Sequence, residues 1–207
     1  MSGRFISLEG GEGVGKSTQA TRLAEALRDR GVDAIVTREP GGSEGAEAIR
    51  DLLMQGSVTR WSAHTEALLF AAARADHVEK HIRPAVEAGE WVICDRFIDS
   101  TRAYQGAQGI DDSAILALHA FGSKGLLPDR TFLLEVPQAE GAERATARDG
   151  AGADRFAARE GSFHEAVGAA FDRIADAEPD RVHRIDATGS PQQVTARLID
   201  ALSDLLP

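Results

Sequence analysis

The chain has 207 residues and a formal net charge of −10, with 43% hydrophobic and 27% charged residues. This composition fits one soluble domain over 1–207, and the negative charge disfavours non-specific nucleic-acid binding, which needs a positive field. No apolar run approaches the roughly 18–20 residues of a membrane span. The N-terminus has no signal-peptide pattern, and the single cysteine, Cys94, excludes an internal disulfide. We therefore expect a cytoplasmic protein without membrane segments, in which Cys94 is a buried strand residue.

Short apolar runs alternate along the chain with amphipathic stretches. The runs predict strands at 4–9, 33–38, 91–95, 131–136 and 182–186. The amphipathic stretches predict helices at 16–30, 44–54, 63–88, 111–122, 138–147, 160–177 and 191–205. Strands that alternate with helices indicate an α/β fold with a parallel sheet covered on both faces. In such sheets ligands bind beyond the carboxyl ends of the strands.

One segment lacks this periodic pattern. Residues 145–161, "ATARDGAGADRFAAREG", are rich in glycine, alanine and charge, with few apolar anchors. This composition suits either a surface loop or a mobile lid that closes over a substrate.

The strongest motif is "GGEGVGKS", which fits G-x-x-x-x-G-K-[ST] and lies between a predicted strand and a predicted helix. Its glycines let backbone N–H groups face phosphates, and the helix N-terminus adds free donors. Lys16 is expected to reach the β- and γ-phosphates of ATP, and the Ser17 hydroxyl is expected to bind Mg²⁺. The expected ATP-binding residues here are Gly10, Gly11, Glu12, Gly13, Val14, Gly15, Lys16, Ser17 and Thr18.

A phosphate-binding loop does not by itself identify what receives the phosphate. The chain has no asparagine, so the N-K-x-D motif by which GTPases bind guanine is absent. The H-R-D…N loop of protein kinases is absent too. A metabolite kinase, a small ATPase and a nucleotide-binding regulator remain.

A second group of polar residues follows the predicted strand 91–95. Asp95 ends that strand, where a carboxylate beside a phosphate-binding loop usually holds a magnesium-bound water, and Arg96 follows it. The alternative is an Asp–Arg pair on the surface. The next polar side chains suit a pocket for a small hydrogen-bonding ligand: Ser100, Thr101, Tyr104 and Gln105.

Two further segments carry residues suited to a nucleotide. Phe70 and Arg74 are four residues apart in "LLFAAARADH" and share one helix face, where a ring and a guanidinium suit a base and a phosphate. Phe70 is otherwise an ordinary core residue. The segment "TREPGGSEGAEAIRDLL" adds Arg38, Pro40 and Arg50 after the second predicted strand.

These segments, together with "ADRF", occur in the order and spacing of bacterial thymidylate kinases. The chain resembles that family from about residue 4 to 200. The resemblance implies a three-layer P-loop NTPase fold with a five-stranded parallel sheet, and a homodimer. It also implies transfer of the γ-phosphoryl group of ATP to dTMP, with Mg²⁺, to give dTDP for dTTP synthesis.

The resemblance further implies roles for individual residues on the dTMP side. Phe70 stacks on thymine, Arg74 lies near the base and the monophosphate, and Tyr104 packs under the deoxyribose. Thr101 and Gln105 lie at the base edge. The full expected dTMP-binding set is Glu12, Arg38, Pro40, Arg50, Phe70, Arg74, Arg96, Ser100, Thr101, Tyr104 and Gln105.

The same resemblance assigns the residues near the transferred phosphate. Arg50 and Arg96 hold the acceptor phosphate, and Glu12 lies near the sugar hydroxyl. Ser17, Asp95 and Glu9 are the expected ligands of Mg²⁺ or of its waters. The expected catalytic residues are Lys16, Arg96, Arg148, Arg155 and Glu12.

The interior of the phosphate-binding loop carries no basic residue, so the chain resembles the bacterial subclass that supplies arginine from a lid. The candidate arginines are Arg144, Arg148 and Arg155, and Arg144 is also expected to bind ATP. They favour the lid interpretation of 145–161, because charge that develops on a transferring phosphoryl group needs cations beyond one lysine. The chain departs from the family pattern at Ala157, where glutamate often stands, and at "AVG" (166–168), where R-V-R is frequent.

Two other functions stay open at this point. One is a different nucleoside monophosphate kinase, or a deoxynucleoside kinase in which Glu9 would deprotonate a 5′-hydroxyl. The other is a non-catalytic ATP-binding regulator, which the arginines of the acceptor side disfavour.

Overall fold

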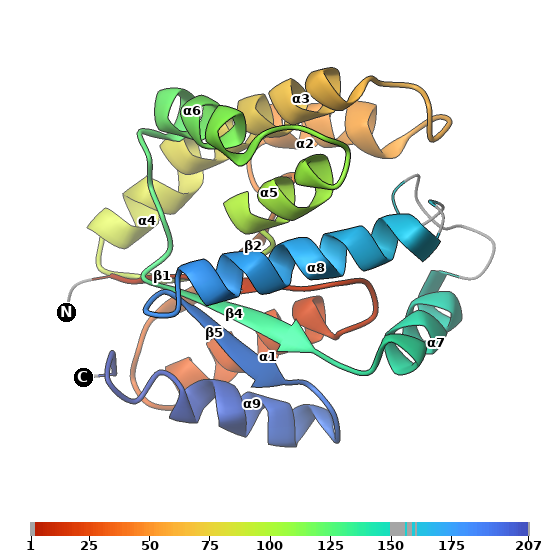
Figure 1. Cartoon of the computed structure of the whole chain (residues 1–207). Helices are drawn as coiled ribbons and strands as arrows, with labels where there is room; N and C mark the ends of the chain where they lie inside the picture. The colour runs from red at the N-terminus through yellow and green to blue at the C-terminus, as the bar shows by residue number, and fades with distance from the viewer. Residues whose placement is uncertain (1–2, 150–155, 157–158, 160, 207) are drawn as a thin grey trace.

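The computed structural model describes residues 3–149, 156, 159 and 161–206. Five strands form one sheet in the order β2-β3-β1-β4-β5, and every neighbouring pair is parallel (Figure 1). This confirms the predicted fold class. The strands are β1 (Phe5–Glu9), β2 (Ala34–Arg38), β3 (Trp91–Asp95), β4 (Arg130–Glu135) and β5 (Val182–Asp186).

Helices cover both faces of the sheet and make three layers (Figure 1). α1 (Lys16–Arg28) and α9 (Pro191–Asp200) pack together on one face. The helical segments that cover the other face are α3 (Ala63–His77), η1 (Val78–Ile82), α4 (Arg83–Glu87), α5 (Ile98–Gly106), α6 (Asp112–Ser123) and α8 (Gly161–Ala177). α2 (Glu44–Met54) packs on α3, and α7 (Gln138–Asp149) follows β4.

The central strand β1 positions the site through the two-residue period of a strand. Ile6 and Leu8 face the core shared with α1 and α9, whereas Phe5 faces the core on the opposite side. Glu9, two residues beyond Ser7 and four beyond Phe5, therefore points toward α5 rather than α1. At the carboxyl end of β1, the Glu9 carboxylate thus points toward one face of the sheet, and the phosphate-binding loop leads to α1 on the other face.

The predicted helix 63–88 is not one regular helix. It is α3, a π-helical turn over η1, and the short α4, which has Pro84 in its first turn. Proline has no N–H to donate and its ring crowds the carbonyl of the preceding turn, so a wide π turn just before it keeps the chain helical.

No helix was expected between residues 95 and 111, and this prediction was wrong, because α5 lies there. Seven of its nine residues are buried, and they include Asp99, Arg102 and Gln105. A helix that buries polar side chains all round has no apolar stripe, which is the signal that periodicity detects. The helix predicted over 138–147 was also too short, because α7 continues to Asp149 and so includes the first residues of the expected lid, 145–149.

Two other expectations concern burial. Cys94 lies in β3 and is fully buried, as predicted. Among the described residues no helix has both the length and the apolar character that a membrane span requires.

Candidate active site

A cavity of about 890 Å³ opens at the carboxyl ends of the strands. It brings together residues that the sequence places far apart, from the phosphate-binding loop, the β2–α2 connection, α3, α5 and α7. The sequence-predicted residues that line it are Glu12, Gly13, Val14, Gly15, Lys16, Ser17, Thr18, Arg38, Pro40, Arg50, Phe70, Arg74, Asp95, Arg96, Ser100, Thr101, Tyr104, Gln105 and Arg144.

Nine residues that line this cavity were not predicted from the sequence, and four of them form the wall after β5. The nine residues are Gln19, Glu39, Met54, Phe97, Phe156, Ala187, Gly189, Pro191 and Val194. The last four follow β5, whose carboxyl end lies at the same edge of the sheet as the phosphate-binding loop. The turn sequence "TGSP" directly after a predicted strand was the available signal, because ligands bind where such strands end.

The phosphate-binding loop depends on glycine for both its conformation and its packing. Gly13 has a φ of +73° and Gly15, which precedes α1, has a φ of +93°. A Cβ on Gly13 would lie only 2.0 Å from the carbonyl oxygen of Gly141 in α7. The loop is therefore packed directly against the helix that carries two of the candidate arginines.

Lys16 is folded over this loop. Its Nζ donates to the carbonyl oxygens of Gly11 at 2.5 Å and Gly10 at 3.2 Å. Burial, reinforced by the nearby Arg96, lowers the pKa of Lys16 to about 8, and the neighbouring Glu12 only partly opposes this. An anion beside a buried ammonium group favours its charged form, so this lysine is suited to a polyphosphate.

Ser17 and Asp95 make the pair of oxygens best placed for a cation. The Ser17 hydroxyl at the start of α1 donates to the Asp95 carboxylate at the end of β3. Hard cations such as Mg²⁺ take oxygen ligands of these kinds. Over the described part of the chain, no three His, Cys, Asp or Glu side chains are grouped as metal ligands.

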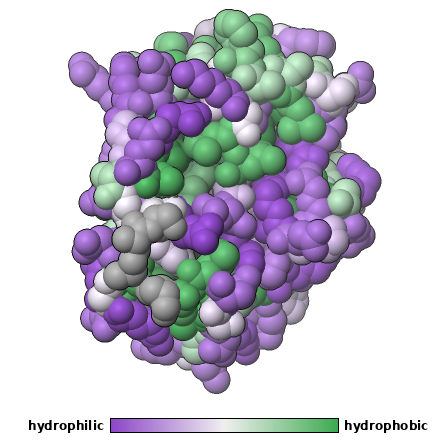
Figure 2. Space-filling view, turned by 90° about the vertical axis from the view of Figure 1, so that its left-hand side faces the viewer, coloured by the Kyte–Doolittle hydropathy of each residue, from purple (hydrophilic) through white to green (hydrophobic). Residues whose placement is uncertain are grey.

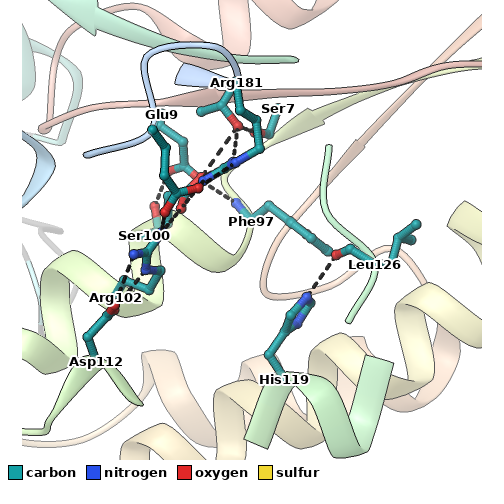
Figure 3. A network of polar contacts seen from close by, with 12 residues as sticks. Ser7, Glu9, Phe97, Ser100, Arg102, Asp112, His119, Leu126 and Arg181 are labelled. Carbon is teal, nitrogen blue, oxygen red and sulfur yellow. Dashed lines mark hydrogen bonds and ion pairs between the residues drawn. The ribbon is translucent and has the colours of Figure 1, made fainter. Parts of the chain in front are cut away.

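Glu9 lies behind the cavity and does not line it. Its carboxylate is fully buried and accepts hydrogen bonds from the Phe97 N–H at 2.7 Å and the Ser100 hydroxyl at 2.5 Å (Figure 3). Burial and the nearby Asp99 raise the pKa of Glu9 from 4.5 to about 7. Glu9 is thus connected to the cavity through Phe97 and Ser100, which both line it.

Arg96 occupies the middle of the cavity. It is one of two described non-glycine residues with positive φ, at +69°, a conformation that is costly and that recurs at functional sites. Its guanidinium donates to Glu12 at 2.6 Å, Ser100 at 2.9 Å, and both the Gly10 carbonyl and the Tyr104 hydroxyl at 3.1 Å. One cation is thereby fixed between the phosphate-binding loop and α5.

Arg74 is anchored on the other side of α5. Only 2% of this arginine is exposed, and its Nε donates to Glu39 at 2.7 Å. Its terminal nitrogen donates to Thr101 at 2.8 Å. Phe70, one turn earlier in α3, is half-buried, and its ring lies 5.7 Å from that of Phe156. The prediction that Phe70 and Arg74 reach one pocket from one helix agrees with this placement.

The remaining predicted arginines have different surroundings. Arg38 is exposed and pairs with Glu47 at 3.2 Å, while Arg50 donates to the Pro40 carbonyl at 2.8 Å. Arg144 in α7 pairs with Glu140. The backbone of Arg148 is part of α7, but its side chain is not among the described parts of the structure. Arg155 lies outside the described residues.

A second polar network, which sequence reasoning also missed, holds α5 in place from behind. Arg181 donates to both carboxylate oxygens of Asp99, at 2.7 Å and 2.9 Å, and Arg102 bonds the same carboxylate at 3.1 Å (Figure 3). Arg102 also bonds Asp112 at 2.7 Å. Asp99 is in the first turn of α5, so these bonds fix the helix that presents Ser100, Thr101 and Tyr104 to the cavity.

The chain matches known proteins over almost all of its length. A family model described as thymidylate kinase matches residues 8–198. Two relatives called thymidylate kinase are similar: one from Rhizorhabdus wittichii is 63% identical with all of both chains covered, and one from Caulobacter vibrioides is 51% identical with 97% of this chain and 96% of the relative covered. The crystal structure of thymidylate kinase from Ehrlichia chaffeensis superposes with a TM-score of 0.80 at 34% identity, covering 98% of this chain and 100% of that one. The chain belongs to the thymidylate kinase family.

Proposed function

We propose that the two parts of the cavity bind the two substrates of one reaction, ATP over the phosphate-binding loop and dTMP between α3 and α5. The chain is a thymidylate kinase, which phosphorylates dTMP to dTDP for dTTP synthesis. The position of Arg96 carries the assignment of the two parts. Its guanidinium bonds the Gly10 carbonyl on one side and Tyr104 on the other, so it lies where the donor and acceptor phosphates would meet.

On the donor side, the triphosphate would lie on the backbone N–H groups of residues 10–18, with Lys16 near the β- and γ-phosphates. The nucleoside would extend toward the residues after β5 that line the cavity, from Ala187 to Val194. Ser17 and Asp95 would hold Mg²⁺ or its waters, and a bound Mg²⁺ would neutralise negative charge on the phosphates.

On the acceptor side, Phe70 would stack on the thymine ring and Tyr104 would pack under the sugar. Arg50 and Arg96 would hold the monophosphate. The acceptor needs no strong general base, because the second pKa of a phosphate monoester is about 6 and its oxygens are already ionised at neutral pH. The position of Glu9 agrees with this, since its carboxylate bonds the Phe97 N–H and the Ser100 hydroxyl and does not line the cavity. The chain's task is to position two polyanions and to exclude water.

Arginines from the α7 region would complete the charge around the transferred phosphate. Arg144 lines the cavity. Arg148 and Arg155 belong to the lid predicted from the sequence over 145–161, most of which lies outside the described residues. If one of them stabilises the transition state, its replacement by alanine should lower kcat much more than it raises the KM for dTMP. If all three alanine variants kept the kcat of the wild type, the assignment would be contradicted.

A homodimer is supported by apolar side chains on two helices that pack together. Phe121 on α6 is 91% exposed and Leu68 on α3 is 56% exposed. Figure 2 shows apolar surface gathered on the upper part of the molecule, at the height of α6 in Figure 1. Exposed apolar area of this kind often marks a protein interface. Phe121→Asp should shift the mass measured by light scattering from two chains to one, and a wild-type chain that is monomeric would contradict the proposal.

Ligand-induced thermal stabilisation tests the assignment of the two parts of the cavity. Both ATP and dTMP should raise the Tm of the wild-type protein, because each binds the folded state. Phe70→Ala should reduce the shift with dTMP and leave the shift with ATP unchanged. A protein that responds to ATP alone would instead be the nucleotide-binding regulator.

A further inference from the structure

Glu66 is a buried carboxylate directly behind the acceptor side of the cavity. It lies in the first turn of α3 and is fully buried. It accepts hydrogen bonds from the amide nitrogen of Gln108 at 2.8 Å and from that of Gln105 at 3.4 Å. The guanidinium of Arg159 donates to both of its oxygens, at 3.1 Å and 3.2 Å. A carboxylate paired with a guanidinium is an acceptor only, so every neighbour must turn a donor toward it.

This requirement fixes the orientation of the Gln105 side chain. Its amide nitrogen faces Glu66, so its amide oxygen points away from Glu66. That oxygen is buried and has no hydrogen-bond partner among the described residues, although Gln105 lines the cavity. A buried acceptor without a partner is costly, and a ligand N–H group would satisfy it.

Arg159 connects this carboxylate to two aromatic residues, Phe163 and Phe156, and Phe156 lines the cavity. Its guanidinium lies 4.5 Å from the centre of the Phe163 ring and 5.5 Å from that of Phe156. Phe156 in turn contacts Phe70. Arg159 therefore fixes the position of the Glu66 carboxylate and also packs on the aromatic rings beside the pocket.

We infer that Glu66, held by Arg159 and Gln108, is a positioning residue that keeps the amide oxygen of Gln105 directed at the acceptor base and so selects bases with an N–H donor at that edge. Thymine and uracil carry such a donor at N3. Cytosine has a lone pair at N3 and would meet the oxygen of Gln105 with repulsion. The inference rests on the proposed placement of the base between α3 and α5.

Glu66→Gln is the direct test, because a neutral amide at position 66 accepts or donates and lets Gln105 turn over. We expect the ratio of kcat/KM for dTMP to that for dCMP to fall by about tenfold or more, mainly through KM, as a correct hydrogen bond is exchanged for a mismatch. The ratio for dTMP to dUMP should stay as in the wild type, because both bases carry the N3 donor. A dTMP:dCMP ratio that does not change would overturn the inference, and so would an equal fall in both ratios, since that indicates a loosened pocket.

Arg159→Met gives an independent test that leaves Glu66 in place. The variant removes the guanidinium that holds both oxygens of Glu66, so Gln105 loses its fixed partner. The dTMP:dCMP ratio should then fall while the dTMP:dUMP ratio holds. Arg130→Met is the matched control. Arg130 is also largely buried, is also paired with a carboxylate, Asp204 at 2.7 Å, and lies at the opposite end of β4 from the site. The Arg130→Met variant should have a lower Tm but unchanged dTMP:dCMP and dTMP:dUMP ratios. If its ratios changed as those of Arg159→Met do, Arg159 would have no specific role in base selection.

Gln105→Leu separates failure of this inference from failure of the underlying assignment. If the base contacts Gln105, this variant lowers the dTMP:dCMP ratio by itself, and adding Glu66→Gln has no further effect on the ratio. If Gln105→Leu leaves the ratio unchanged, the placement of the base is wrong. If it lowers the ratio but Glu66→Gln does not, Glu66 has no positioning role.

Discussion

Replacing Glu9 with glutamine probes the electrostatics behind the site without any substrate. Burial, with a further contribution from Asp99, moves the pKa of Glu9 from 4.5 to about 7. The folded state therefore binds a proton more tightly than the unfolded state does. The resulting stabilisation is complete below pH 4.5 and is lost as the pH rises to about 7. A pKa change of this size corresponds to about 3 kcal/mol.

Glutamine preserves the shape and the acceptor oxygen for the Phe97 N–H but cannot ionise. The free energy of unfolding of the wild type and of Glu9→Gln should be measured in urea at several pH values from 4.5 to 8. Other titrating groups contribute to both proteins, so the difference between the two isolates Glu9. The wild type should lose about 3 kcal/mol relative to the variant across this range. A difference that is constant with pH would refute the burial argument.

Four other substitutions test the donor and acceptor sides. Lys16→Ala should lower kcat on the order of 10²-fold or more, because it removes a preorganised cation from the phosphates; turnover close to wild type would contradict the ATP site. Phe70→Ala should weaken dTMP binding by about 1–3 kcal/mol in calorimetry, the value of one base–aromatic stack, and a loss confined to ATP would exclude the stacking role. Gly13→Ala should abolish ATP binding, since the added Cβ would lie 2.0 Å from the Gly141 carbonyl. Unchanged ATP affinity in calorimetry would show that α7 can move away from the loop. Arg96→Lys should lower kcat strongly despite the retained charge, because an ammonium cannot reproduce the planar fork, and wild-type kcat would show that charge alone suffices.

The sequence was most informative about the edge of the sheet where the site lies. The order of strands and helices predicted the parallel sheet, and the glycine-rich motif predicted the phosphate-binding loop, because both depend on local pattern. Arg74, Arg96 and Tyr104 were predicted for the cavity from a family resemblance. Helical spacing with Phe70 also indicated Arg74, and a place after the strand 91–95 also indicated Arg96 and Tyr104. The structure brings them together within one cavity.

Other features depend on contacts that are remote in sequence. The bond between Arg181 and Asp99 joins residues 82 positions apart, and no local pattern marks either residue. Glu66 and Arg159 are likewise distant in sequence, and they pair only because the fold brings Arg159 next to α3. α5 escaped prediction for a related reason, since the polar partners that let it be buried all round come from other elements.

The most direct test of the whole account is an assay of ADP release with ATP and Mg²⁺, in which dTMP, dUMP, UMP, dCMP, AMP and thymidine are compared as acceptors. We expect a large preference for dTMP in kcat/KM and no turnover of thymidine, which lacks the phosphate that Arg50 and Arg96 would hold. Robust turnover of thymidine or AMP, with none of dTMP, would keep the phosphate-binding loop and contradict the acceptor site around Phe70 and Arg74.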